Sequence, residues 1–267
     1  MKFVERRIAD ERVVRLIRKW LTAGVWENGR VTWTEEGTPQ GAAISPLLAN
    51  VYLHYVFDDW AQAWRSTQAH GDVVAVRFAD DFIVGFQHKT DAERFRAELV
   101  ERFRQFGLAL HPDKTRLIEF GRFADRDRSN RGDGLPESFD FLGFTHRCGK
   151  TRNGKFLVVR RTMRKRLVAK LRAVKTDLLR RLHLPLPQLG AWLRSVVQGH
   201  FRYYGVPTNS GSLTAFRFRL VALWRRVLGR RSHRGRVTWE RMRRIAARWL
   251  PLPRICHPWP AERFGVP

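Results

Sequence analysis

The charges of this 267-residue chain are divided unequally between its two halves. Residues 1–146 carry 21 Lys or Arg and 22 Asp or Glu, whereas residues 147–267 carry 30 Lys or Arg and 3 acids. Thirty cations with so few acids repel one another at physiological salt unless a polyanion neutralises them. The break therefore predicts two units, 1–150 and 151–267, with a nucleic-acid surface on the second. The alternative is a solvated basic surface without a partner.

The composition is that of a folded protein. Hydrophobic residues make up 43% and aromatic residues 12% of the chain, which is enough to bury a core and excludes pervasive disorder. Cys148 and Cys256 are too far apart in sequence to indicate a zinc module or a disulfide framework. The N-terminus has no apolar signal region, and no apolar run is long enough to cross a bilayer. We therefore expect a soluble, intracellular protein with no membrane partner.

The first half alternates between helical and strand periodicity. Ser45 followed by Pro46 is typical of a capped helix start, and Thr90 with Glu93 is typical of a capping box. The expected elements are a helix at 9–23, a hairpin at 25–34 around Asn28 and Gly29, a helix from Ser45 to Trp64, strands at 72–78 and 82–86, a helix from Thr90 to Phe106, and strands at 116–120 and 139–145. This order predicts an α+β arrangement of strand pairs and helices.

The second half has helical periodicity almost throughout. Apolar residues recur at helical spacing in four segments, and cations fill most other positions. The expected helices cover 161–182, 188–204, 212–228 and 239–250, which predicts a small all-α bundle. Trp192, Trp224 and Trp249 fall on apolar faces and are expected in its core.

Asp80 and Asp81 form the most chemically suggestive pair in the chain. They separate two short β-branched and aromatic runs, so they are expected at the tip of a hairpin. Two adjacent carboxylates at such a tip offer the hard oxygen ligands that Mg²⁺ prefers, and nucleotidyl transfer requires such a site. The alternative is that aspartate is simply favoured in turns.

The segment at 38–53 supplies a second feature. It begins with a loop that contains Gln40 and Gly41, and this loop runs directly into the helix expected at Ser45. Backbone amides at a helix start can approach a phosphate, Gly41 leaves access open, and Gln40 offers an amide to a base or sugar. The alternative is a loop and a helix cap without a ligand.

Together these features resemble the reverse transcriptase/maturase encoded in group II introns, and the resemblance covers almost the whole chain. Its motifs occur in the family's order: Thr38–Leu53, Arg77–Phe82, Leu110–Thr115, Phe139–Phe144, Gly199–Gly205 and Arg254–Pro258. The resemblance implies a partial reverse-transcriptase palm at 1–150, made of antiparallel strands with helices but lacking the fingers and first palm motif. An all-α thumb/maturase domain would follow at 151–267.

The resemblance also implies roles for single residues. Asp80 would coordinate the catalytic Mg²⁺, with Mn²⁺ as an alternative, and Asp81 would support it. Nucleotide and template contacts would fall to Pro39, Gln40, Gly41, Phe78 and Lys114, and the primer grip to Phe141, Leu142 and Gly143. The partners implied are intron RNA, an RNA template, a DNA primer and dNTPs, in the bacterial cytoplasm with the nucleoid or a ribonucleoprotein.

Six cations near the start of the second half are expected to contact the RNA backbone. A structural core has no use for so many cations, and an arginine fork matches a phosphate with two hydrogen bonds. These residues are Arg160, Arg161, Arg164, Lys165, Arg166 and Lys170.

The chain departs from the family pattern in three ways. Phe78 stands in place of a usual tyrosine, and Ala42 with Ala43 replaces a Gly-rich pair. The family also has a metal-binding aspartate upstream of a segment like Ile8–Asp10, whereas Asp10 itself is better interpreted as a helix cap. Two hypotheses remain open: an RNA-directed DNA polymerase, or an intron-RNA-binding maturase remnant that does not polymerise. A third is that a separate N-terminal fragment supplies the aspartate.

Overall fold

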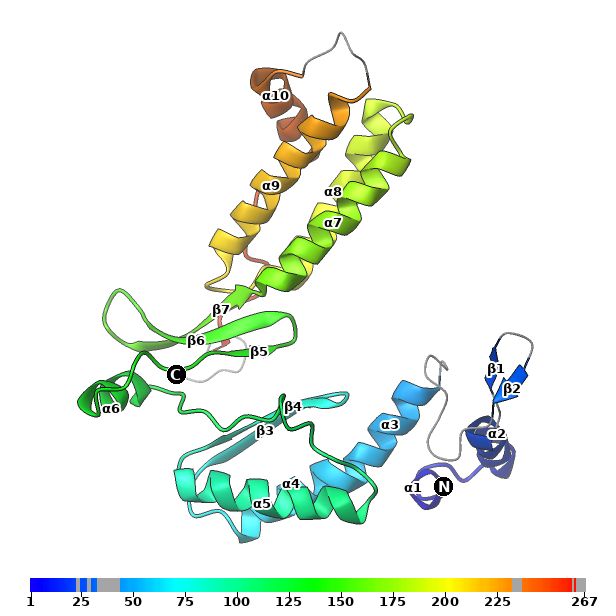
Figure 1. Cartoon of the computed structure of the whole chain (residues 1–267), viewed down its shortest axis with the longest axis vertical. Coiled ribbons are helices and arrows are strands. Elements are labelled where there is room, and N and C mark those ends of the chain that lie inside the picture. Colours follow the sequence, from blue (N-terminus) through cyan, green and yellow to red (C-terminus); the bar gives the residue numbers. More distant parts are fainter. Residues whose placement is uncertain (23–24, 28–29, 33–43, 232–236, 261, 263–267) are drawn as a thin grey trace. The chain divides into compact units, whose positions relative to one another are not determined.

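The computed structural model describes residues 1–22, 25–27, 30–32, 44–231, 237–260 and 262 (Figure 1). The chain forms two compact units, Met1–Leu117 and Ile118–Pro267. The sequence predicts a boundary after residue 150. That position lies within the second unit, between the paired strands β6 and β7, which are defined below. The assignment of palm and thumb to 1–150 and 151–267 stays a prediction.

The first unit mixes helices with short antiparallel strand pairs. Its elements are α1 (Lys2–Glu5), α2 (Glu11–Thr22), β1 (Val25–Glu27), β2 (Arg30–Thr32), α3 (Ser45–Leu53), the π-helical turn η1 (His54–Asp58), α4 (Asp59–Thr67), β3 (Val73–Phe78), β4 (Asp81–Phe86) and α5 (Lys89–Gln105). The α+β class, the paired strands at 25–32 and 73–86, and the helices around them are confirmed. Asn28 and Gly29 lie outside the described residues.

Three local predictions in or near this unit are wrong. The residue before α3 is Ile44, so Ser45 lies inside the helix rather than at its cap. Likewise α5 begins at Lys89 after His88, which places Thr90 within the first turn. Residues 116–120 form no strand in the described structure. The Asp10 cap is confirmed, because its carboxylate accepts a hydrogen bond from the amide of Arg12 at 2.8 Å.

The core of the first unit lies between the β3–β4 hairpin and the helices α4 and α5 (Figure 1). Phe57, Trp64 and Phe95 are almost completely buried there. The Trp64 indole donates to Glu98 at 2.8 Å, so the ring keeps a polar partner at the edge of the core. The hairpin is thus held against helices through one of its two faces.

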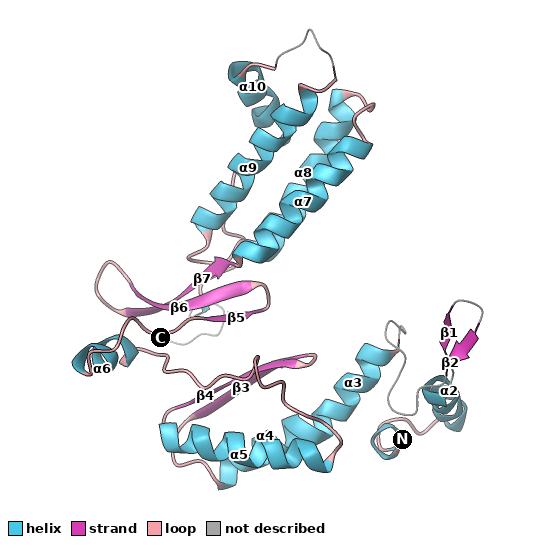
Figure 2. Ribbon diagram, viewed as in Figure 1, coloured by secondary structure: helices cyan, strands magenta, loops and turns pink. Residues whose placement is uncertain are grey.

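The second unit contains the short helix α6, then a three-stranded sheet and then a helical bundle (Figure 2). Its elements are α6 (Ala124–Asn130), β5 (Phe139–Phe141), β6 (Phe144–Lys150), β7 (Phe156–Thr162), α7 (Arg164–Arg180), α8 (Leu186–Tyr204), α9 (Ser210–Leu228) and α10 (Trp239–Trp249). The four expected helices are confirmed. Residues 151–267 are not entirely helical, however, because β7 pairs along its whole length with β6.

The bundle encloses a continuous apolar core. Trp224, Phe216 and Leu193 have no exposed surface, and Trp192 and Trp249 pack against this cluster, which confirms the expected core role of the tryptophans. Buried Asn209 joins sheet to bundle: its amide donates to the Thr162 hydroxyl and the Tyr204 carbonyl, and its oxygen accepts from the Thr162 amide. In the described part of the chain, every helix is too short or too polar to span a membrane.

Candidate active site and nucleic-acid interface

The predicted carboxylate pair lies at the tip of the β3–β4 hairpin. Phe78 pairs with Asp81, which leaves Ala79 and Asp80 as the two turn residues. Ala79 has a φ of 55°, in the left-handed region where a β-carbon is disfavoured, so the neighbouring hydrogen bonds must hold the turn. Both aspartates are exposed, as a site for a charged ligand requires.

The two faces of the hairpin differ sharply. One face carries Val73, Ala75 and Arg77 toward the helices. The other carries Val74, Val76 and Phe78, which are 60%, 48% and 64% exposed. Because residues paired across antiparallel strands share a face, Asp81 lies on the same open face as Phe78. The Asp81 carboxylate therefore borders an exposed apolar surface, a feature that commonly marks a binding site.

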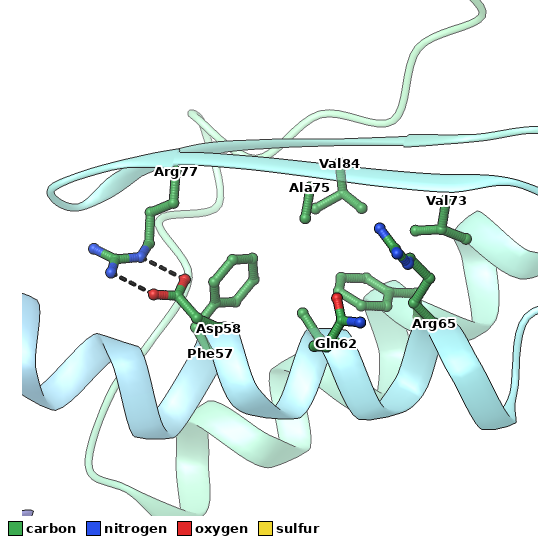
Figure 3. A pocket seen from close by; sticks show the side chains of 10 residues that line it. Phe57, Asp58, Gln62, Arg65, Val73, Ala75, Arg77 and Val84 are labelled. Atoms are coloured by element: carbon green, nitrogen blue, oxygen red, sulfur yellow. Dashed lines mark hydrogen bonds and ion pairs between the residues drawn. The ribbon is translucent and has the colours of Figure 1, made fainter.

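Arg77 anchors the tip from the opposite face. Its Nε and one terminal nitrogen donate to the two Asp58 carboxylate oxygens at 2.7 and 2.6 Å (Figure 3). Its other terminal nitrogen donates to the Asn50 side-chain oxygen and to the Ala79 carbonyl, each at 2.8 Å. The hydrogen bond to Asp58 raises the pKa of Arg77, although burial opposes this shift. One guanidinium thus joins α3, η1 and the strained turn.

A cavity of about 240 Å³ lies beside this clamp, between the hairpin and α4. Figure 3 shows Gln62 and Arg65 rising from α4 toward the side chains of Val73, Ala75 and Val84. The cavity lies beneath the hairpin face that carries Arg77, opposite the face of Asp81. It is separate from the carboxylate site.

The tip suits a hard divalent cation. Mg²⁺ in polymerase-type sites is commonly held by one or two carboxylates together with the phosphates of the substrate, and Asp80 and Asp81 supply two exposed carboxylates on a fixed turn. Among the described residues, no group of three or more His, Cys, Asp or Glu side chains is placed to hold a metal ion. A fuller protein ligand set would need a carboxylate from elsewhere.

The remaining predicted nucleotide contacts are less well defined. Pro39, Gln40 and Gly41 lie outside the described residues. Lys114 is exposed in the turn at 112–114 of the first unit, and its ammonium group has no ion pair with the described residues. Its proximity to an incoming triphosphate stays a prediction.

The predicted primer-grip residues form the tight turn between β5 and β6, which is named the grip turn below after this prediction. Phe141 pairs with Phe144, and Leu142 and Gly143 between them have φ values of 48° and 79°. The turn is fixed to the end of α8, because the Tyr203 hydroxyl donates to the Leu142 carbonyl at 2.9 Å. A β-carbon on Gly143 would come within 2.9 Å of the Tyr204 hydroxyl, so glycine is required there by shape as well as by φ.

The motif at 199–205 supports this hairpin rather than presenting an open site. His200 is buried, with its ring 3.8 Å from the ring of Phe216 and 4.6 Å from that of Tyr204. Burial, and to a lesser degree the charge of Lys170, lowers the pKa of His200 to about 4. A neutral imidazole in this position serves packing.

The motif at 254–258 returns to the same place. The Gly205 carbonyl accepts hydrogen bonds from the amides of Cys256 and His257 at 2.6 and 3.1 Å. The His257 imidazole donates to the Arg202 carbonyl at 2.6 Å. Three motifs that are distant in sequence, the grip hairpin and the two bundle motifs, thus meet around the end of α8.

The six predicted RNA-contacting cations divide into two groups. Arg160 and Arg161 lie on β7 and are partly buried, and burial lowers the pKa of Arg160. The other four lie on α7 with exposed side chains: Arg164, Lys165, Arg166 and Lys170. Lys165 comes within 4.0 Å of Asp140, a surface pairing that leaves it 75% exposed. Their contact with RNA stays a prediction.

Several other arginines have structural partners that the sequence did not indicate. Arg194 donates to the carbonyls of Arg248 and Trp249, Arg217 to those of Leu250 and Pro251, and Arg225 to that of Val237. These three cations of the second half therefore have structural roles. These guanidinium groups donate to backbone carbonyls before, at the end of, and just after α10.

Asn50 and Asp58 were missed as site residues. Both interrupt an otherwise apolar helical stretch, which was the available signal, but their partner Arg77 follows later in the chain on a strand. The π-helical turn that ends at Asp58 adds a local irregularity of the kind often found at functional sites.

Known proteins resemble the chain in different parts. The chain is 24% identical to an uncharacterized 91 kDa protein in the cob intron of Schizosaccharomyces pombe, in an alignment that covers 80% of its length. It is 32% identical to protein YkfC of Escherichia coli K12 over half of its length, and 49% identical over 51 residues, 19% of its length, to the group II intron-encoded protein LtrA of Lactococcus lactis. These alignments span 33%, 44% and 8% of the respective relatives, less than half in each case.

The family comparison is more extensive. The family described as Reverse transcriptase (RNA-dependent DNA polymerase) matches residues 2–146, which include the β3–β4 hairpin and the grip turn. The resemblance to group II intron-encoded reverse transcriptases, expected from the order of the motifs, is confirmed by the similarity to LtrA. The chain belongs to the reverse transcriptase (RNA-dependent DNA polymerase) family.

Proposed function

We propose that the chain acts on group II intron RNA as an RNA-directed DNA polymerase and maturase, and that Asp80 and Asp81 carry its nucleotidyl-transfer chemistry. The observation that supports this most directly is the exposed carboxylate pair on a hairpin tip that Arg77 holds in place. Rigid placement matters because polymerase catalysis depends on positioning charge at the reacting phosphate. The RNA partner would place the protein in the cytoplasm with the nucleoid or a ribonucleoprotein.

In this mechanism the residues of the chain position the ions, the nucleotide and the primer, and they form no covalent bond with the substrate. Asp80 and Asp81 would hold Mg²⁺, or Mn²⁺, together with the triphosphate of the incoming dNTP. When bound, the divalent ions lower the pKa of the primer 3′-hydroxyl and neutralise the pyrophosphate leaving group. Phe78, on the exposed face of the β3–β4 hairpin, would lie against the nucleotide, and Lys114 would approach the triphosphate. The grip turn at Leu142 and Gly143 would position the DNA primer on the RNA template.

Primer extension tests the proposal. The full chain is incubated with an RNA template, a DNA primer, dNTPs and Mg²⁺, alongside the variants Asp80→Ala and Asp72→Ala. Asp72 is an exposed carboxylate just before β3 and serves as the matched control. Extension that is lost in Asp80→Ala and retained in Asp72→Ala supports the polymerase, and equal extension by both variants contradicts it.

The second candidate is a maturase remnant that binds intron RNA without polymerising. It is favoured by the two-carboxylate ligand set, because the described residues bring no third His, Cys, Asp or Glu to the hairpin tip. Absence of extension by the parent chain, together with salt-sensitive binding of intron RNA, would select it. Extension that appears when a separate polypeptide carrying a palm aspartate is added would instead indicate complementation in trans.

A further inference from the structure

The outer surface of the bundle carries an apolar groove between α7 and α9. It has a volume of about 340 Å³ and is lined by Val168 and Leu171 from α7 and by Phe218, Ala222 and Leu223 from α9. Phe218 is 70% exposed, although a phenylalanine on a packed helix normally turns toward the core. The groove is therefore an open apolar floor with an aromatic ring at its surface.

Four cations surround this floor. Arg172 and Lys175 stand on α7, and Arg219 and Arg226 stand on α9. All four are exposed, and none forms an ion pair with a residue that the structure describes. No acidic residue lines the groove in the described structure. These unneutralised cations attract a polyanion. The apolar residues between them suit a flat, apolar group of the same ligand.

We propose that this α7–α9 groove binds single-stranded RNA, with an unpaired base stacked on Phe218 and the adjoining phosphates on the four cations. The inference rests on the proposed RNA-binding function and adds a site outside the six cations assigned to it. A base has a π-face that stacks on an exposed aromatic ring, and cations beside the ring can neutralise the adjoining phosphates. A duplex hides its bases, so it would gain nothing from the apolar floor.

The charge of the groove also favours RNA over a second copy of the chain as its occupant. Two copies meeting through the groove would bring eight like charges together, four from each groove, without acids to offset them. RNA releases condensed counterions when the same cations bind it, so its binding is favoured where self-association is opposed.

The test uses the full chain and a short single-stranded RNA with one 2-aminopurine, whose fluorescence falls when it stacks. A blunt RNA duplex of the same length is the second probe. The variant Phe218→Ala removes the ring, Phe218→Trp restores an aromatic surface, and Leu252→Ala is the matched control because Leu252 is 72% exposed in the same unit and lies outside the groove. Thermal unfolding checks that all variants fold.

Phe218→Ala is expected to weaken single-strand binding roughly five- to a hundredfold, the range of one lost base–aromatic stack, and to abolish the fluorescence change. Phe218→Trp and Leu252→Ala should bind like the parent, and duplex binding should be unchanged in every variant. Arg226→Ala should lower the salt slope of single-strand binding by about one ion.

Two results would overturn the site. One is equal single-strand affinity of the parent and Phe218→Ala. The other is a Phe218-dependent dimer in sedimentation without RNA, which would make the groove a contact between copies. If the parent chain did not bind the duplex at all, the proposed RNA-binding function would be contradicted instead. Failure of the groove proposal and failure of the proposed function are therefore distinguishable.

Discussion

The guanidinium of Arg77 and the carboxylate of Asp58 form a two-point pair at 2.7 and 2.6 Å that joins β3 of the β3–β4 hairpin to the π-helical turn η1. Arg77 is 12% exposed and Asp58 is 32% exposed, so the pair is shielded from water on one side. Because Arg77 also holds the Ala79 carbonyl, the pair fixes the residue immediately before Asp80.

Arg77→Ala should therefore lower the free energy of unfolding by about 2 kcal/mol, since it leaves a partly buried carboxylate without its partner and releases the turn. Chemical denaturation measures the loss. The double variant with Asp58→Ala should lose less than the sum of the two single variants. The control Arg96→Ala, an exposed arginine on α5, should change stability by less than about 0.5 kcal/mol. Strict additivity would contradict the pairing.

Gly143→Ala should destabilise the second unit more than Gly154→Ala does. The two glycines have similar φ values, 79° and 75°, but a β-carbon at Gly154 meets open space, whereas one at Gly143 meets the Tyr204 hydroxyl. Gly154→Ala should cost about 1 kcal/mol from backbone strain alone, and Gly143→Ala at least about 1 kcal/mol more. Equal shifts in thermal unfolding would show that the grip turn does not depend on its contact with Tyr204.

The stability of the bundle should fall as the pH decreases from 6.5 toward 4. The pKa of His200 is lowered from 6.5 to about 4 by burial, so the unfolded chain binds the proton more readily within this window and protonation favours unfolding. The loss should approach about 3 kcal/mol and should be absent above the unfolded pKa. In His200→Phe, which retains a ring against Phe216, this part of the pH dependence should disappear. A profile identical to that of the parent would refute the assignment.

Asp91 should stabilise the first unit down to strongly acidic pH. It is buried and accepts hydrogen bonds from the His70 side chain and from the amides of His70 and Gly71, which lower its pKa from 3.8 to about 2. Its contribution is fully present above pH 3.8 and is lost as the pH falls through about 2. Asp91→Asn should therefore be less stable than the parent at neutral pH, and the difference in unfolding free energy should shrink across that window. Asp72→Asn, at an exposed position, should show no such convergence.

The sequence predicted elements best where the pattern is local. The runs at 72–78 and 82–86 identify a hairpin by their own composition, and Asp80 and Asp81 follow at its tip. By contrast, β7 was not predicted, because its cations Arg160 and Arg161 continue into the helical pattern and only pairing with β6 keeps the segment extended. Register between segments is a tertiary property that short-range periodicity does not contain.

The sequence predicted which residues could bind ligands, but not which residues hold them in place. Charge alone does not distinguish Arg225, which caps a backbone carbonyl, from Arg226, which faces the open groove, although they are adjacent. Nor does sequence distance reveal that Arg77 meets Asp58. These distinctions depend on which side of a helix faces a neighbour, and that is decided by packing.

The hydrogen bonds from Cys256 and His257 to the Gly205 carbonyl set an order of events during synthesis. The end of α8 leaves the ribosome before residues 256–257 do, so the Gly205 carbonyl lacks these two donors while the intervening chain is synthesised. A chain that stops short of residue 256 therefore lacks the backbone hydrogen bonds that join the C-terminal segment to the end of α8.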